Sequence, residues 1–306
     1  MIIAIDHGNS AIKTPHFSFV AGVSEHTVKP PMTDEVLEYD GKFWTLTGNR
    51  LSYMRDKTQD SRYFILTLFA IARELENEGK LAVPEQIYLA VGLPPEHYGA
   101  LKARFAQYFK KEAPINFVYK DKLVRISIQN VLVYPQAYAA VIPYASQLLH
   151  TVRMFVIDIG GYTTDVLLLR NGKPDLQFCR SLEMGVITMN NEIIRKVSAL
   201  HDMLIEDDHI NAVLRGEDTI LPMDVVETIQ QAAILHTHNI LNKLRELQVD
   251  LRSNPAIFIG GGSILFRDYI EKSNLVVKAN FVEDSKANAI GYQMLAGKQL
   301  GYRQIG

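Results

Sequence analysis

Cysteine is almost absent from this sequence, since Cys179 is the only one among 306 residues. A lone cysteine excludes a disulfide within the chain and a cysteine-based zinc site. No apolar run approaches the ~18 residues of a membrane-spanning helix. The apolar start reaches Asp6 directly after residues 2–5 and carries no basic segment, so it is not a signal peptide. These absences predict a cytoplasmic protein that does not associate with membranes.

Positive charge is not in excess either. The chain has 32 Lys and Arg against 34 Asp and Glu, a net charge of -2. Proteins that grip nucleic acid directly carry a basic surface, so we expect no direct nucleic-acid binding, while binding through a partner stays open. Hydrophobic residues make up 47% and charged residues 22%, which suits a soluble protein with a sizeable core. The length favours two domains or one large α/β unit.

Strands and helices are expected to alternate along the chain. Short-period repeats, heptads and low-complexity segments are lacking, so the alternation predicts an α/β protein with parallel or mixed sheets. A small hairpin-rich insertion is expected over about 24–57. We expect strands at 1–6, 11–20, 87–92, 153–159, 164–170, 256–259 and 276–281, with one or two in 115–133, and helices at 60–78, 95–111, 136–149, 186–200, 206–215, 224–248 and 285–295.

Two halves of the sequence open in the same way. Ile3–Gly8 and Val156–Gly161 each run from a buried strand through an aspartate into a glycine turn. Such a turn exposes successive backbone N–H groups, which bind an anion. Asp6 and Asp158 would repel a phosphate there unless a hard cation intervenes, and Mg²⁺ is the usual one. Lys13, if it lies on a returning strand, reaches back to phosphate oxygens. One such turn alone is equally a hairpin with a capping aspartate, but the pair favours phosphate binding.

A third glycine turn follows the strand expected at 256–259. Gly260, Gly261 and Gly262 come in succession and leave the main chain bare, so that a flat ring or a ribose can pack on it. The alternative is a flexible loop in which Ser263 caps the next helix. This segment therefore predicts an adenosine contact.

Several other side chains invite a functional interpretation. His7, beside Asp6, is expected to be a turn residue rather than a catalyst. His236 and His238 are two apart on a helix and point to different faces, which argues against a metal pair. Trp44 and Tyr53 lie in the expected insertion. We expect them to pack within the protein, and a contact with another subunit is the alternative.

In their order, these segments resemble the superfamily of actins, Hsp70 chaperones and sugar kinases. The resemblance is strongest to the bacterial plasmid-segregation actins of the ParM/StbA type, and it covers nearly the whole chain. The matching segments are Ile5–Lys13 (IDHGNSAIK, first phosphate motif), Val133–Ala140 (VYPQAYAA, first connecting motif), Phe155–Asp165 (FVIDIGGYTTD, second phosphate motif), Ile257–Ser263 (IFIGGGS, adenosine motif) and Asn288–Tyr292 (NAIGY, second connecting helix).

The resemblance implies a role for each matching residue. Asp6 and Asp158 would hold Mg²⁺ through water and take part in catalysis with Gln136, which would orient the attacking water. Lys13 would pair with phosphate oxygens, and Gly185 resembles the glycine that starts a nucleotide-side helix. Phosphates would be held by Gly8, Asn9, Ser10, Gly160, Gly161, Tyr162 and Thr163, and adenosine by Gly260, Gly261, Gly262 and Ser263.

One residue departs from the segregation actins. Several of them carry Glu where this chain has Gln136, and Gln is the residue of eukaryotic actin. An amide is not a general base, so its role is to orient water, as in GTPases. Hydrolysis is then expected to be slow until filament contacts align the site.

Three functions remain open at this stage. The first is a filament-forming ATPase, with GTP as an alternative nucleotide, that segregates plasmid DNA through a DNA-binding adaptor. The second is a small-molecule kinase of sugar-kinase type, which needs a carboxylate base where this chain has Gln136. The third is a chaperone-like or scaffolding module without turnover. We expect the actin-like ATPase fold, two related α/β domains around a nucleotide cleft: domain I over 1–150 and 284–306, domain II over 151–283.

Overall fold

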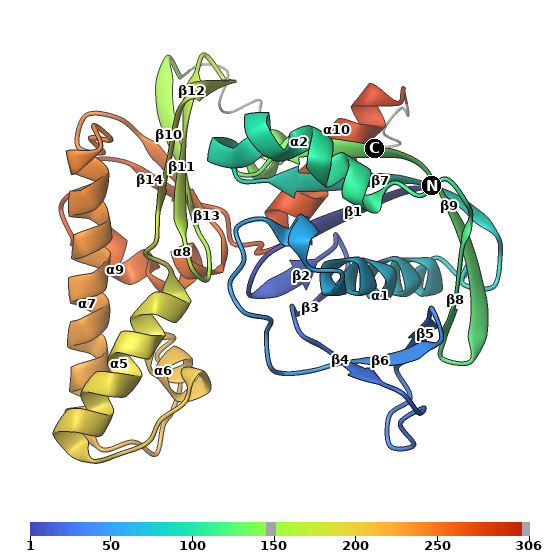
Figure 1. Ribbon diagram of the computed structural model, residues 1–306. Helices are drawn as coiled ribbons and strands as arrows, with labels where there is room; N and C mark the ends of the chain where they lie inside the picture. Colours follow the sequence, from blue (N-terminus) through green and yellow to red (C-terminus); the bar gives the residue numbers. More distant parts are fainter. Residues whose placement is uncertain (145–150, 302–306) are drawn as a thin grey trace. The chain divides into compact units, whose positions relative to one another are not determined.

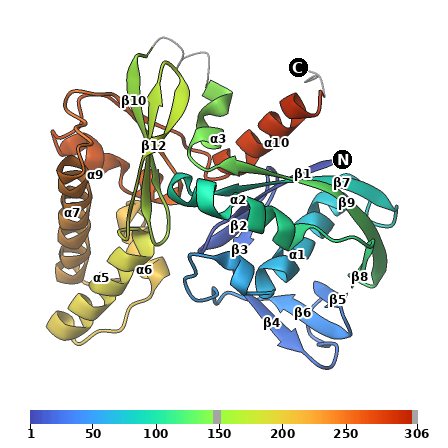
Figure 2. The ribbon, with the colours of Figure 1, turned by 45° about the horizontal axis from the view of Figure 1, so that its top comes forward.

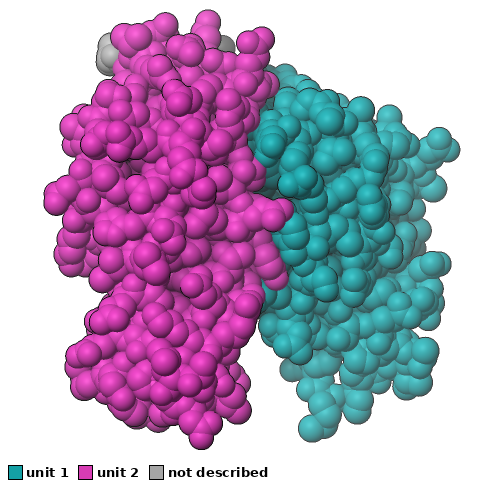
Figure 3. All heavy atoms as spheres, turned by 60° about the vertical axis from the view of Figure 1, so that its left-hand side comes forward, with its two compact units in different colours: residues 1–143, 286–306 teal, residues 144–285 magenta. Residues whose placement is uncertain are grey.

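The computed structural model describes residues 1–144 and 151–301 of the chain. By their internal contacts the residues form two compact units, Met1–Pro143 with Lys286–Gly306, and Tyr144–Ser285. Figure 3 colours them separately, and we call them unit 1 and unit 2. The end of the helix expected at 136–149 and the last residues of the expected domain I lie outside the described residues.

Unit 1 is built on one mixed sheet (Figure 1). Its strands follow one another in the order β3-β2-β1-β7-β9-β8-β5-β6-β4. The first strand pairs antiparallel with β2 and parallel with β7, and β7 is parallel to β9. The strands are β1 (Ile2–His7), β2 (Ala11–Lys13), β3 (Ser18–Val20), β4 (Val23–His26), β5 (Val36–Tyr39), β6 (Lys42–Leu46), β7 (Glu85–Leu93), β8 (Ile115–Tyr119) and β9 (Lys122–Pro135).

Helices cover both faces of this sheet because β1 is apolar on both. Ile3 and Ile5 pack with α1 (Arg62–Asn77) and α2 (Pro95–Phe109) in one cluster. Ala4, which points to the opposite face, lies in a second cluster with α3 (Tyr138–Val141) and α10 (Ala287–Gln299). Unit 1 also contains the short helical turn η1 (Lys57–Gln59), and a second one, η2 (Ile142–Tyr144), lies where the chain passes from unit 1 to unit 2.

Unit 2 has a smaller sheet in the order β12-β11-β10-β13-β14. Phe155, Ile157 and Ile159 point from β10 into a core that α5, α6 and α7 close. Helices α5 and α7 contact each other, with α5 lying at an angle to α7 (Figure 2). The elements are β10 (Arg153–Ile159), β11 (Thr164–Arg170), β12 (Lys173–Leu182), β13 (Ala256–Ile259), β14 (Ala279–Phe281), α5 (Val186–His201), α6 (Asp207–Leu214), α7 (Met223–Glu246), α8 (Gly261–Leu265) and α9 (Arg267–Lys272).

The two units repeat one strand pattern. In each, the first strand pairs antiparallel with the second, which pairs antiparallel with the third, and the first strand pairs parallel with a later one. Strands β1, β2, β3 and β7 of unit 1 thus correspond to β10, β11, β12 and β13 of unit 2. The predicted duplication of an α/β half is confirmed.

Three expected elements differ from the structure. The strand expected over 11–20 is the two strands β2 and β3, because Thr14 N–H donates to the Phe17 carbonyl at 2.8 Å and closes a turn between them. The helix expected from 136 begins only at Tyr138, since β9 continues to Pro135. The strand expected over 276–281 is confined to Ala279–Phe281. The insertion strands β4, β5 and β6 join the unit 1 sheet through the pairing of β5 with β8.

Candidate functional site

Asp6, Lys13 and Gln136 come together at the end of β1. Asp6 and Lys13 are directly opposed partners in the β1–β2 pair, so the expected returning strand is present. Gln136 follows β9, and its Nε2 donates to Asp6 Oδ1 at 2.8 Å. Asp6 is only 5% exposed, so this amide satisfies a buried carboxylate. The structure therefore joins two residues 130 positions apart for which the sequence predicted one site.

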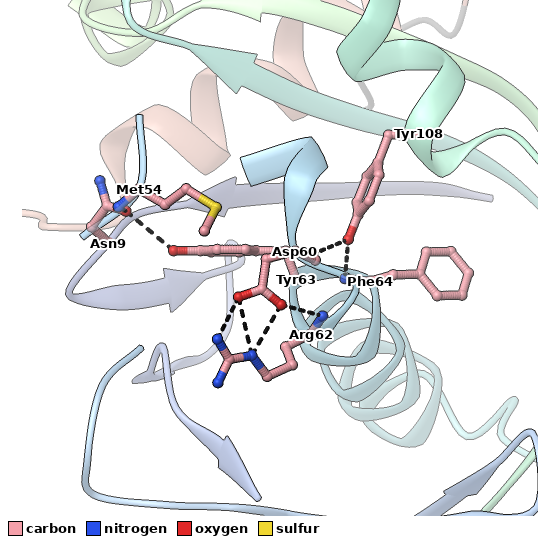
Figure 4. A network of polar contacts seen from close by, with 7 residues as sticks. All are labelled: Asn9, Met54, Asp60, Arg62, Tyr63, Phe64 and Tyr108. Atoms are coloured by element: carbon pink, nitrogen blue, oxygen red, sulfur yellow. Dashed lines mark hydrogen bonds and ion pairs between the residues drawn. The ribbon is translucent and has the colours of Figure 1, made fainter. Parts of the chain in front are cut away.

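The loop between β1 and β2 is tight. A Cβ on Gly8 would lie 2.6 Å from the carbonyl oxygen of Ala11, so the loop closes only with glycine there. Asn9 Oδ1 accepts hydrogen bonds from the backbone N–H of Met54 at 3.3 Å and from the Tyr63 hydroxyl at 3.1 Å (Figure 4). Asn9 and Ser10 are half-buried. The Asn9 side chain thus connects the loop to the start of α1. Phosphate binding by the backbone N–H groups of this loop stays a prediction.

A polar network holds that start of α1 (Figure 4). Arg62 pairs with both carboxylate oxygens of Asp60 at 2.6–3.0 Å and lowers the pKa of that carboxyl. Tyr108 from α2 donates to the Asp60 carbonyl at 2.7 Å and accepts the Phe64 N–H at 2.9 Å. The sequence did not point to Tyr63 and Tyr108, because their contacts join distant elements and leave no local signal.

The corresponding loop of unit 2 is held by main-chain contacts. Asp158 opposes Asp165 in the β10–β11 pair, and Thr163 Oγ1 donates to Asp165 Oδ2 at 2.9 Å. The Gly160 N–H donates to the Thr163 carbonyl at 2.8 Å. The first N–H groups of α5 donate to this loop, from Val186 to Gly160 at 3.1 Å and from Ile187 to Gly161 at 2.7 Å. Tyr162, at the loop tip, is half-buried.

Gly185 lies directly against this loop. A Cβ there would come within 2.5 Å of the Gly161 carbonyl oxygen, so only glycine allows the approach. Gly185 is the N-cap of α5, and Thr188 Oγ1 accepts its N–H at 2.9 Å and donates to its carbonyl at 2.6 Å. The glycine to which the resemblance pointed at position 185 therefore lies where the backbone requires glycine.

The third glycine turn packs on the same loop. Gly260 has a φ of 85°, and a Cβ there would collide with Asp158 Oδ1. A Cβ on Gly262 would lie 2.5 Å from Ile159 Cγ2, whereas Gly261 is exposed and open. Ser263 is buried inside α8, with its hydroxyl donating to the Gly260 carbonyl at 2.8 Å, so it is not the cap of that helix. Unit 2 thus brings together all its predicted site residues.

His7 is not a turn residue, contrary to expectation. It is the last residue of β1 and 2% exposed, with Nε2 at 2.8 Å from Thr67 Oγ1 and its ring stacked on Phe109 at 4.9 Å. Burial, with the nearby charge of Lys57, lowers the pKa of His7 to about 3. His7 is therefore a neutral residue of the unit 1 core. A small pocket of unit 1 is lined by Gln136 and by the charged residues Arg55, Asp56 and Lys57.

Two family models match the chain. The N-terminal domain of actin-like proteins matches residues 4–138, and the C-terminal domain of archaeal MreB-like actin homologues matches residues 156–272. Each model falls within one compact unit. The chain belongs to the actin-like proteins. It has the fold of an actin-like ATPase, as the motif order predicted.

Solved structures give the same fold. The archaeal actin homologue Ta0583 matches at 19% identity and a TM-score of 0.78, over 97% of this chain and 99% of that one. A subunit of a 15-stranded ParM filament from Clostridium botulinum matches at 19% identity and a TM-score of 0.75, with the same coverage. The sequence has no match among curated proteins. Within residues 1–144 and 151–301, no helix is long and apolar enough to span a membrane.

Proposed function

We propose that this chain binds ATP with Mg²⁺, hydrolyses it and assembles into filaments with copies of itself. The observation that carries the proposal is the pair of strand–aspartate–glycine hairpins in the same register, Asp6 opposite Lys13 and Asp158 opposite Asp165. An actin homologue of the same fold was solved with ADP, a ParM from Bacillus thuringiensis with AMPPNP, and a Clostridium botulinum ParM as a filament. These relatives support adenine nucleotide as the ligand and self-association as its consequence.

The residues of both units fit a nucleotide. The loops at Gly8 and Gly160 turn tightly, as an anion cradle requires, and Lys13 supplies a cation beside the first. The open main chain at Gly261 suits a flat adenosine ring. Mg²⁺, held through water by Asp6 and Asp158, would neutralise phosphate charge. We propose that units 1 and 2 act as the actin-like domains I and II, each of which contributes one phosphate loop to nucleotide binding.

Gln136 is the proposed water-positioning residue. Its Nε2 donates to Asp6, so its Oε1 is the amide atom that accepts a hydrogen bond from the attacking water. This contact fixes the side chain without making it a base, because a neutral amide does not take up the proton. Slow hydrolysis in the monomer, faster in the filament, follows from that chemistry.

The cellular role we propose is plasmid segregation in the cytoplasm. The net charge of -2 lacks the positive excess typical of proteins that bind DNA directly, so a DNA-binding adaptor would connect filament and plasmid. A sugar-type kinase is the alternative within the fold. Gln136 argues against it, since phosphoryl transfer to a hydroxyl calls for a carboxylate base at such a position.

Phosphate release measured over a range of protein concentrations tests the proposal. With ATP and Mg²⁺ we expect turnover to rise above a threshold concentration at which electron microscopy shows filaments, and GTP is tested in parallel. Asp158→Ala should lower turnover at least ~100-fold, because it removes electrostatic positioning worth several kcal/mol. Asp268→Ala, which removes an exposed carboxylate of unit 2, is the control. Sugar-stimulated turnover without a threshold, or wild-type turnover in Asp158→Ala, would overturn the proposal.

A further inference from the structure

The backbone makes an unusual turn directly after Gln136. Ala137 has φ 62° and ψ -51°, and the Tyr138 N–H donates to the Gln136 carbonyl at 2.6 Å. This is a γ-turn of the positive-φ type, which is rare and strained for a residue with a side chain. Such strain persists only where the surroundings hold the backbone in place. The turn directly sets the direction in which the Gln136 side chain leaves the main chain.

The surroundings hold this turn from two sides. Before the turn, the Gln136 N–H donates to the Leu93 carbonyl at the end of β7, at 2.8 Å. At its centre, the Ala137 N–H donates to the side-chain oxygen Oδ1 of Asn288 at 3.0 Å, in a buried hydrogen bond between residues 151 positions apart. Asn288 is the second residue of α10. One side chain of the C-terminal helix therefore satisfies the strained peptide.

Helix α10 is also seated firmly against the segment that follows. A Cβ on Gly291 would collide with the carbonyl group of Ala139 in α3, so the two helices touch along their main chains. Ala139 and Gly291 are both buried. Since α10 has no room to shift against α3, the position of Asn288 relative to Ala137 is closely defined.

We propose that Asn288 is a positioning residue: its side-chain carbonyl holds the γ-turn at Ala137 and thereby keeps the Gln136 amide on Asp6. A buried hydrogen bond and the strain of a left-handed alanine are of similar size, so removing the bond lets the turn relax. The Gln136 side chain then loses its hydrogen bond to Asp6, which lies 130 positions earlier in the sequence. The consequence for hydrolysis rests on the proposed function, but the effect on Gln136 itself does not.

The first measurement follows Gln136 directly. In protein labelled with ¹⁵N at glutamine, the side-chain NH₂ signal of Gln136 is the one that disappears in Gln136→Ala. We expect Asn288→Ala to move this signal to the shift of a solvent-exposed glutamine, and Asn288→Asp, which keeps the acceptor oxygen, to leave it near its wild-type place. Adding Ala137→Gly to Asn288→Ala should move it back part of the way, because glycine adopts a positive φ without strain.

A matched control lies on the same helix. Gln299 accepts the Tyr134 hydroxyl at 2.8 Å, so Gln299→Ala also removes a hydrogen bond between α10 and the end of β9, but not the one on the turn. The Gln136 signal should stay in place in this variant. If Asn288→Ala does not fold, Asn288→Ser, which also lacks the carbonyl, replaces it.

The second measurement is single-turnover phosphate release together with nucleotide affinity. Asn288→Ala should slow phosphate release about tenfold and leave the ATP dissociation constant within about twofold, since the loss falls on the transition state rather than on binding. A wild-type protein without turnover would refute the proposed function alone, because the Gln136 signal still tests the positioning. An unmoved Gln136 signal in folded Asn288→Ala or Asn288→Ser, or an equal movement in Gln299→Ala, would overturn the inference.

Discussion

The β1–β2 hairpin of unit 1 and the β10–β11 hairpin of unit 2 share one backbone plan. Asp6 opposes Lys13 and Asp158 opposes Asp165, so the loops have the same length and register. Glycine follows the strand in both, and each glycine lies close to the carbonyl of the residue three further on. The charge opposite the aspartate is nonetheless reversed.

The difference shows which features the backbone requires and which it leaves free. Both hairpins have glycine at the turn, where a Cβ would lie 2.6 Å from a backbone oxygen at Gly8 and 3.3 Å at Gly160. The directly opposed position, by contrast, holds Lys13 in one hairpin and Asp165 in the other. The loops are also anchored differently, by the Asn9 side chain in unit 1 and by the first N–H groups of α5 in unit 2. Buried His7 occupies the register position at which unit 2 has Ile159.

The largest expected effect is a loss of folding stability at acidic pH, which arises from His7 in unit 1. Burial lowers the pKa of His7 to about 3, so the unfolded chain takes up a proton between pH 6.5 and 3 that the folded chain does not. Stability therefore rises with pH in that window and is lost on acidification. From pH 7.5 to pH 5 the loss from His7 is about 2 kcal/mol.

Denaturant unfolding of wild type and His7→Ile at both pH values measures this loss. The variant, which gives unit 1 the residue type of Ile159, should lose less stability on acidification. His236 also has its pKa lowered by burial, so only the difference between the two proteins is assigned to His7. Equal losses in wild type and variant would show that His7 takes up its proton in the folded chain.

The next effect concerns the reversed charge. Lys13→Met should weaken ATP binding about tenfold, or ~1.4 kcal/mol, because it removes a charge-assisted hydrogen bond to phosphate. Asp165→Asn should change the affinity less than about twofold, since an amide oxygen still accepts from Thr163. Calorimetric titration with ATP and Mg²⁺ decides between them. Similar losses in both variants would mean that the hairpins do not differ in their role.

The smallest effect tests the shared glycines. A Cβ on Gly8 would lie 2.6 Å from a backbone oxygen, but one on Gly160 would lie 3.3 Å from the corresponding atom. Gly8→Ala should therefore be less stable than Gly160→Ala by about 1 kcal/mol in chemical denaturation. Gly48→Ala, at an open position outside helices and strands, controls for the general effect of replacing a loop glycine by alanine. A Gly160→Ala protein as unstable as Gly8→Ala would contradict the difference in tightness.

Much of the fold was predictable because its signals are local. The strand expected at 256–259 is β13 (Ala256–Ile259), and the helix expected at 186–200 is α5 (Val186–His201). Strand β12 was not predicted as an element, since Lys173–Leu182 mixes polar and apolar residues and its register with β11 shifts near Leu167. A bulge breaks the alternation by which a strand is recognised.

The site was predictable only in its parts. Each glycine turn and its aspartate could be read from a few neighbouring residues, because a buried strand followed by glycine is a local pattern. The sequence did not predict that Gln136 leaves β9 through a strained turn, because the turn at Ala137 depends on a side chain in α10. The start of α1, held by Tyr108, depends in the same way on another helix.

By itself, the sequence determined that this protein has duplicated α/β halves, each opening with an aspartate and a glycine turn, and that it belongs with the actin-like proteins. Strand and helix periods, glycine and charge act over a few residues, so one chain is enough to read them. Only the tertiary structure decided that His7 is a neutral core residue, that Gln136 lies on Asp6 and that Asn288 holds its turn. These outcomes depend on burial and on hydrogen bonds between distant segments, which exist only once the chain has packed.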